Sequence, residues 1–182
     1  YNMITGIPNH SSGLKSGGIL GLDVGLGKTI CTLGLVVKSG GKTLVVCKLS
    51  LIDQWIKETR LFTNLTIGEI HGKKKVCNND PDIIFTTYGT LVSHYKRGGY
   101  LRRDFDRIVF DESHTLKSTG TTLDACIHTT ASKRWCLSAT PFRDGIFKNI
   151  LYQMQMMNVI GMTNSVVSSV VYNPYCTRNE FI

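Results

Sequence analysis

The sequence predicts an α/β fold in which a mostly parallel central sheet carries helices on both faces. Short apolar runs, most of them rich in β-branched residues, recur along the chain, for example at 43–47, 82–85, 107–110 and 134–137. Strands that are apolar on both faces are typical of buried parallel sheets. Helical patterns alternate with these runs, and this alternation indicates helices packed on both sides of the sheet.

The chain opens with a further apolar run at 18–22, which we interpret as the first strand. Apolar residues then recur at helical spacing after Thr29. A second helix is expected to start at an N-cap, Ser50, and a third carries an apolar stripe from Leu123 to Ala131. The basic run 73–75 reads as an exposed loop, and Trp55 as a core residue of the second helix. A final helix is expected to place core residues at Met154, Met156 and Met157.

Length and composition limit the possible classes of protein. The 182 residues correspond to about one domain, and 42% hydrophobic with 19% charged residues is an ordinary globular mix. The longest apolar runs are far shorter than the roughly 20 residues of a membrane helix, so we expect no membrane partner. The net charge of +8 permits a polyanionic partner without identifying one.

The six cysteines are scattered, with no C-x-x-C pair. This pattern predicts buried free thiols in a reducing, intracellular compartment, and it predicts no zinc site. We expect a tail and loop at 1–17, one nucleotide-binding lobe at 18–160, and an extension of undecided structure at 161–182.

A glycine-rich turn stands between the first strand and the first helix. Its glycines let consecutive backbone N–H groups point at phosphate oxygens, and the helix N-terminus adds a positive partial charge. Lys28 would reach the β- and γ-phosphates of a nucleotide, and the Thr29 hydroxyl would hold Mg²⁺. The strict pattern requires glycine at position 22, where this chain has leucine. The candidate nucleotide-binding residues are Gly25, Leu26, Gly27, Lys28, Thr29 and Ile30.

Two adjacent acids, Asp111 and Glu112, follow the apolar strand at 107–110. An acid at the end of such a strand suits Mg²⁺ coordination, and its neighbour can position and deprotonate an attacking water. A solvent-facing acidic pair without function is the alternative. Because parallel strands present their carboxyl ends at one sheet edge, we expect Lys28 and the acidic pair to converge around a metal-bound triphosphate.

A small-residue turn, Ser138-Ala139-Thr140-Pro141, ends the strand at 134–137. Its hydroxyls are placed to sense the γ-phosphate and to pass that state to a neighbouring domain. A plain turn without function remains the alternative for this tetrapeptide alone.

In this order, Gly-Leu-Gly-Lys-Thr, Asp-Glu-Ser-His and Ser-Ala-Thr-Pro resemble the first RecA-like lobe of superfamily-two helicases, which is a P-loop NTPase lobe. The segments 18–30, 44–51, 86–91 and 107–118, with Gln54-Trp55 and Glu58, are similar to Swi/Snf-type DNA translocases. The resemblance implies an ATP hydrolase that uses ATP and Mg²⁺ and moves along double-stranded DNA. RNA remains possible as the substrate.

The resemblance also implies roles for individual residues. Lys28, Asp111 and Glu112 would be catalytic, with Thr29 and Asp111 as metal ligands. His114, Ser138 and Thr140 would couple the site to a second RecA-like lobe, whose arginine would complete it. The nucleic-acid contacts would be Lys48, Ser50, Thr86, Thr87, Tyr88 and Lys117.

The resemblance bears on this chain's activity and place in the cell as well. We expect weak hydrolysis from this chain by itself, because the second lobe and the adenine-binding glutamine are not found in it. A nuclear location, or another site of DNA metabolism, is expected.

Two other functions stay open at this point. A DEAH-type helicase acting on RNA or DNA is favoured by Ser138-Ala139-Thr140 and opposed by the segments 18–30 and 44–51. A nucleotide-gated scaffold that does not hydrolyse ATP is opposed by the presence of Lys28, Thr29, Asp111 and Glu112.

Overall fold

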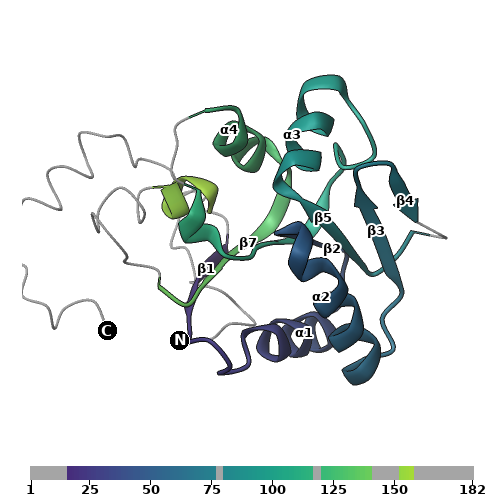
Figure 1. Ribbon diagram of the computed structural model, residues 1–182, viewed down its shortest axis with the longest axis vertical. Coiled ribbons are helices and arrows are strands. Elements are labelled where there is room, and N and C mark those ends of the chain that lie inside the picture. Colours follow the sequence, from purple (N-terminus) through teal and green to yellow (C-terminus); the bar gives the residue numbers. More distant parts are fainter. Residues whose placement is uncertain (1–15, 77–79, 117–119, 141–151, 158–182) are drawn as a thin grey trace, which may run out of the picture.

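A single sheet organises the computed structural model (Figure 1). The structure describes residues 16–76, 80–116, 120–140 and 152–157. Within these ranges the sheet has seven strands in the order β1-β7-β6-β2-β5-β3-β4. Every neighbouring pair is parallel except β3 and β4, which run antiparallel at one edge. The strands are β1 (Ser16–Gly21), β2 (Thr43–Cys47), β3 (Ile67–His71), β4 (Lys74–Val76), β5 (Ile83–Thr87), β6 (Phe105–Phe110) and β7 (Ala131–Ser138).

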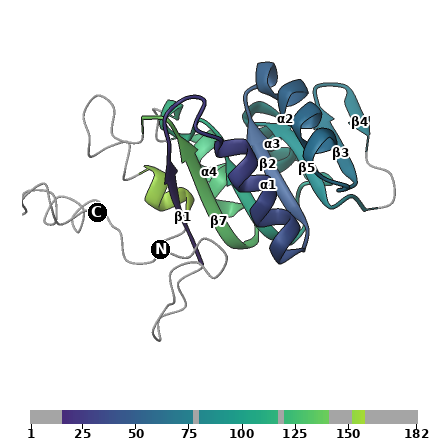
Figure 2. The ribbon, with the colours of Figure 1, turned by 90° about the horizontal axis from the view of Figure 1, so that it is seen from below.

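Helices cover both faces of the sheet, as the sequence predicted. In the ribbon, α1 and α2 lie on one face and α3 and α4 on the other (Figures 1 and 2). The helices are α1 (Lys28–Ser39), α2 (Leu49–Phe62), α3 (Tyr88–Arg97) and α4 (Thr121–His128), with a short 3₁₀ turn, η1 (Ser113–Thr115), after β6. None of these described helices combines the length and the apolar character needed to cross a bilayer.

Two apolar clusters hold these layers together, one on each face. Successive side chains of a strand point to opposite faces, so β2 contributes Leu44 and Val46 to one cluster and Val45 and Cys47 to the other. The first cluster packs under α3 and α4, and the second under α1 and α2. This two-sided burial is the physical reason that β2 is apolar at every position from Leu44 to Cys47.

Several predicted elements match the structure and several do not. The strands expected at 43–47, 82–85, 107–110 and 134–137 all fall within or next to observed strands. The basic run does not form a loop, because Lys74 and Lys75 belong to β4. Lysine side chains are common on such edge strands, where they discourage pairing with a second sheet. β3 and α3 had not been predicted from the sequence.

Three expected details of the helices need correction or limitation. Ser50 lies inside the first turn of α2, whose N-cap is Lys48. Ala131 starts β7 and is not part of the α4 stripe. A helical turn at 152–156 buries Met156 completely, while Met154 and Met157 are only partly buried. The segments 1–15 and 158–182, which include the whole of the predicted extension at 161–182, lie outside the described residues.

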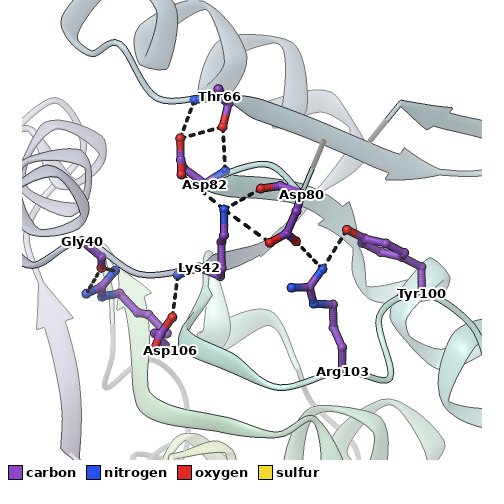
Figure 3. Close-up of polar contacts among 9 residues, drawn as sticks. Gly40, Lys42, Thr66, Asp80, Asp82, Tyr100, Arg103 and Asp106 are labelled. Atoms are coloured by element: carbon purple, nitrogen blue, oxygen red, sulfur yellow. Dashed lines mark hydrogen bonds and ion pairs between the residues drawn. The ribbon is translucent and has the colours of Figure 1, made fainter. Parts of the chain in front are cut away.

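The loops at the amino ends of the strands are joined by a network of charged side chains (Figure 3). Lys42, just before β2, forms ion pairs with Asp80 at 3.5 Å and Asp82 at 3.4 Å. Arg103 pairs with Asp80 at 2.6 Å and donates to the Tyr100 hydroxyl at 2.8 Å. Each charge in this network therefore has an opposite charge beside it.

Two arginines are buried almost completely, and both bind uncharged oxygens. Arg107 donates to Thr43 Oγ1 at 2.8 Å and to the Ser39 hydroxyl. Arg134 donates to the carbonyls of Cys126, Thr129 and Met156. Burial lowers the pKa of Arg134 to about 10. By binding these carbonyls, Arg134 ties the end of α4 and the turn at 152–156 to β7.

Candidate nucleotide site

The carboxyl ends of β1, β7 and β6 lie side by side, and this brings the predicted motifs together. In the parallel register, Gly21 at the end of β1 stands opposite Ser138 at the end of β7, and Cys136 stands opposite Phe110. The glycine-rich loop follows β1 directly, and Asp111 follows β6 directly. The strand that ends in Ser138 therefore separates the loop from the acidic pair.

The glycine-rich loop has the backbone geometry that phosphate binding requires. Gly25 and Gly27 both have φ of 83°, a left-handed conformation that favours glycine. Open space lies where a Cβ atom would stand at either position. α1 starts at Lys28, so the N–H groups of its first turn have no acceptors within the helix and face the loop. Such a loop leaves room for an anion to approach the backbone closely.

Lys28 is held beside this loop. Its ammonium group donates to the carbonyls of Leu22 at 2.9 Å and Asp23 at 3.2 Å. It is also near enough to Asp111 to act on its charge, and this interaction opposes the rise in the pKa of that carboxyl. Lys28 and Asp111 thus follow strands whose carboxyl ends lie on the same side of the sheet.

Asp111 is a buried carboxylate, only 6% exposed, with hydrogen bonds to both oxygens. Oδ2 accepts from the indole N–H of Trp55 at 2.9 Å, and Oδ1 accepts from the backbone N–H of Glu112 at 2.9 Å. Burial raises the pKa of Asp111, and the negative charge of Glu112 adds to that rise; the bonds from Trp55 and Glu112 N–H oppose it. A buried acid of this kind gains most from a nearby cation.

Glu112 has a left-handed backbone, with φ of 51° and ψ of 40°. For a residue other than glycine this conformation is uncommon, and it is often found at functional sites. Its carboxylate lies 3.4 Å from His114 Nε2, and His114 Nδ1 lies 2.8 Å from the Ser138 hydroxyl. The Ser138 oxygen in turn accepts the backbone N–H of Thr140 at 3.0 Å. The three residues predicted to couple the site thus form one chain of contacts that begins at Glu112.

The residues predicted to contact nucleic acid differ in how exposed their side chains are. Lys48 and Ser50 are exposed at the start of α2. Thr87, partly buried, caps α3 by accepting the N–H of Thr90 at 3.2 Å. Thr86 is fully buried and donates to the Ile70 carbonyl, and its contact with nucleic acid stays a prediction. Lys117 lies outside the described residues.

Tyr88, also predicted to contact nucleic acid, points its hydroxyl toward the acidic motif. Its hydroxyl donates to the main-chain carbonyl of Asp111 at 2.8 Å, and burial raises its pKa well above the usual range. The structure thus places Tyr88 beneath the acidic pair. Its ring packs with the apolar cluster under α3 and α4.

Sequence reasoning also missed two other partners of the acidic motif. Trp55 was assigned to the core, which is correct, but its hydrogen bond to Asp111 was not foreseen. Gln153, fully buried, accepts from the Ser113 hydroxyl at 2.9 Å and so connects the acidic motif to the turn at 152–156. A buried indole N–H needs an acceptor, and that requirement was the available signal for Trp55.

A hollow of about 410 Å³ lies near the amino ends of β6 and β7, between α3, α4 and the loop before β6. Its walls include His94, Arg102, Arg103 and His128. The glycine-rich loop is largely exposed at the carboxyl ends of the strands, whereas Asp111 at the same side of the sheet is buried.

ATP and Mg²⁺ fit this carboxyl edge by the chemistry of its residues. The loop offers backbone N–H groups and an ammonium group to phosphate oxygens, and Thr29 follows Lys28 on the first turn of α1. Asp111 offers a buried carboxylate, the type of ligand that Mg²⁺ prefers. The fold and the site together define a P-loop ATPase lobe.

Comparison with known proteins identifies the family. The SNF2-related domain family matches residues 9–170, and the chain belongs to this family. The SWI2/SNF2 ATPase core of Sulfolobus solfataricus, solved in complex with double-stranded DNA, matches with a TM-score of 0.65 at 26% identity. That match covers 80% of this chain and 32% of the archaeal one. The chain is therefore the N-terminal lobe of an SNF2-family ATPase motor domain, and its family implies that it uses ATP.

Two relatives extend this comparison. A probable global transactivator of Orgyia pseudotsugata multicapsid polyhedrosis virus is 35% identical over 146 residues, covering 72% of this chain and 29% of the viral protein. The DNA repair protein RAD5 of Yarrowia lipolytica is 36% identical over 160 residues, covering 71% of this chain and 16% of that protein. The chain thus spans less than a third of the length of these relatives.

Proposed function

We propose that this lobe binds Mg²⁺-ATP and forms half of the hydrolytic site of a motor that moves along double-stranded DNA. The observation that carries the proposal is the placement of the glycine-rich loop after β1 and of Asp111 after β6 at the carboxyl ends of parallel strands in one sheet. Membership of the SNF2-related family supports it, and so does the archaeal ATPase core solved with double-stranded DNA.

Each residue of the site has a distinct task in this proposal. The loop N–H groups bind the phosphates, and Lys28 leaves its two carbonyl partners to bind the β- and γ-phosphate oxygens. Thr29 and Asp111 hold Mg²⁺, which supplies positive charge to the phosphates when it is bound. Glu112 orients the attacking water and accepts its proton, as a base placed one residue beyond the metal ligand can do.

A second RecA-like lobe of the same full-length protein would close the site. Phosphoryl transfer needs positive charge on the transferred group, and an arginine from a partner contributes about 10³–10⁵ in rate in related nucleotide hydrolases. Lys28 alone meets part of that need. The contact chain from Glu112 through His114 to Ser138 is placed to report the state of the site to that lobe.

Duplex DNA would lie against the exposed start of α2. Lys48 and Ser50 stand there with the first N–H groups of the helix, and such groups bind phosphates without reading base sequence. The net charge of +8 favours that contact. We infer a location in the cell where DNA is metabolised.

The test uses Glu112→Gln in the full-length protein, with Glu58→Gln as the matched control on α2. Loss of the base is expected to lower DNA-stimulated ATP hydrolysis by about 10²–10⁴-fold, while ATP binding persists. The control is expected to keep its rate within about twofold of the unaltered protein, because Glu58 pairs with Gln54 away from the site.

Unchanged turnover in Glu112→Gln would refute the catalytic assignment. Stimulation by duplex DNA supports a translocase. Stimulation by single-stranded RNA would support the DEAH-type helicase instead, which the Ser138-Ala139-Thr140 turn favours. Binding of ATP with no turnover in the unaltered full-length protein would support a nucleotide-gated scaffold.

A further inference from the structure

Trp55 lies at the centre of α2, on the face that packs against the sheet. It is 3% exposed, and its ring lies against Phe85 of β5 with ring centroids 5.9 Å apart. Its indole N–H leaves this apolar contact and reaches Asp111 Oδ2, 56 residues further along the chain. Packing alone does not require this polar atom, because a phenylalanine or leucine fills an apolar gap without one.

The backbone of Asp111 is already held from two sides. Its N–H donates to the Val46 carbonyl at 2.8 Å, and its carbonyl accepts from the Tyr88 hydroxyl at 2.8 Å. With the main chain held, the remaining freedom of the residue is rotation of its carboxylate. Glu112 N–H restrains Oδ1, and the Trp55 indole restrains Oδ2. Trp55 is the member of this set that comes from outside the β6 turn and binds the carboxylate directly.

We propose that Trp55 is a positioning residue for the Mg²⁺ held by Asp111. This inference rests on the proposed function of the site. Mg²⁺ requires near-ideal octahedral geometry, so a ligating carboxylate must present its oxygen at a defined angle. A carboxylate oxygen that accepts one hydrogen bond keeps further lone-pair capacity for a metal. Hydrogen bonds of this kind to metal ligands are worth about 10–100-fold in metal affinity or activity when they are removed.

An indole is well suited to this task for two reasons. It is a donor only, so it cannot compete with Asp111 as a ligand. It is also rigid and neutral, so it orients the carboxylate without cancelling the negative charge that attracts the metal. A lysine or arginine at the same place would neutralise that charge.

Trp55→Phe removes the N–H and keeps the aromatic ring. Trp135→Phe is the matched control, because Trp135 is a buried tryptophan of the same apolar cluster and stands on β7. The sequence contains two tryptophans, so the 182-residue chain is expected to show two indole N–H resonances, and each variant assigns one of them.

The measurement is the dissociation constant of a fluorescent, non-hydrolysable ATP analogue, taken once with excess Mg²⁺ and once with EDTA. The dissociation constant in EDTA divided by that in Mg²⁺ is the factor by which the metal strengthens nucleotide binding. Trp55→Phe is expected to lower this ratio about tenfold and to leave affinity in EDTA within about twofold. Trp135→Phe is expected to leave the ratio within about twofold of the unaltered chain. In the unaltered chain, Mg²⁺ added to the nucleotide complex is expected to shift the Trp55 indole resonance more than that of Trp135.

Two results would overturn the role of Trp55. One is an unchanged ratio in a folded Trp55→Phe. The other, which does not depend on that variant folding, is a Trp55 resonance that stays in place when Mg²⁺ binds the complex. Either result leaves the proposed function standing. An unaltered chain that does not bind the analogue with or without Mg²⁺ would overturn the proposed function, and this inference with it.

Discussion

Charged residues have different partners at the two ends of the parallel strands, here called the amino edge and the carboxyl edge of the sheet. At the amino edge, Lys42, Asp80, Asp82 and Arg103 neutralise one another in a network of ion pairs (Figure 3). At the carboxyl edge, Lys28 donates to two carbonyls of its own loop. The Asp111 carboxylate accepts from two uncharged donors, the Trp55 indole and the backbone N–H of Glu112. The charges at the amino ends stabilise the fold, and in the proposed function the charges at the carboxyl ends bind a ligand.

The two edges also shift the pKa values of their aspartates in opposite directions. Opposite charges and donated hydrogen bonds lower the pKa of Asp80 and Asp82, because their ionised forms are favoured in the fold. Burial raises the pKa of Asp111, because its ionised form is disfavoured until a cation arrives. Functional sites commonly carry this kind of unfavourable electrostatics, which a bound ligand relieves.

Replacing Lys28 and Lys42 separately by methionine should distinguish the roles of the two edges most strongly. Lys28→Met is expected to lower ATP turnover of the full-length protein by about 10²–10³-fold, because a preorganised cation at the phosphates is lost. Its unfolding midpoint should change little. Lys42→Met should keep turnover and lose about 1 kcal/mol of stability, since its two ion pairs are partly exposed. Hydrolysis assays and urea unfolding of both variants provide the comparison; equal loss of turnover in both would contradict it.

Two glycines with nearly equal φ angles should sharpen the comparison. Gly41 has φ of 82°, and a Cβ there would stand 2.7 Å from Asp106 Cγ. Gly41→Ala is therefore expected to cost about 2–4 kcal/mol, from backbone strain and overpacking. Gly27→Ala meets open space and should cost about 1–2 kcal/mol from its φ of 83° alone.

Nucleotide binding should show the reverse order for these glycines. A methyl group at position 27 occupies space that a phosphate needs, so affinity for an ATP analogue should fall at least about tenfold in Gly27→Ala. Gly41→Ala should bind normally at temperatures where it is folded. Chemical unfolding and fluorescence titration measure the two effects, and weaker binding in Gly41→Ala than in Gly27→Ala would contradict the assignment.

Acid should lower the stability of the fold modestly by protonating Asp82 at the amino edge. The Thr66 hydroxyl and N–H hold the pKa of Asp82 below its ordinary value of about 3.9, so its ionised form stabilises the fold above that value. This contribution is lost as the pH falls through the lowered pKa. Asp82→Asn is expected to be less stable at pH 7 and to lose less further stability between pH 4 and pH 2. Urea midpoints against pH test this, with Asp124→Asn on the exposed surface of α4 as the control.

Much of the site was predictable because its signals are local. An apolar run, a glycine-rich turn and a lysine at a helix start occur within a dozen residues, and they predicted β1 and α1 with the glycine-rich turn between them. The acidic pair followed from the same logic at the end of β6. β3, β4 and α3 were missed because their segments lack strong periodicity, and β4 has a strand pattern only when it pairs with β3.

Local sequence patterns did not predict the side-chain contacts of Thr86, Tyr88 and Trp55. Nothing in the neighbouring residues distinguishes a threonine that faces solvent from one that donates to the carbonyl of Ile70 across the sheet. The direction of the Tyr88 hydroxyl likewise depends on where β6 ends. These contacts join residues far apart in the chain, so they become visible only when the strand order is known.

The amino-acid sequence by itself determined which residues stand at the carboxyl ends of the strands, since each polar turn follows its apolar run directly. It therefore established that Lys28, Asp111 and Ser138 share one edge of an α/β sheet. Only the tertiary structure decided that β7 lies between β1 and β6, that His114 meets Ser138, and that Trp55 binds Asp111. The physical reason is that local periodicity encodes burial and direction, whereas contacts between distant segments depend on strand order and on how the helices pack over it.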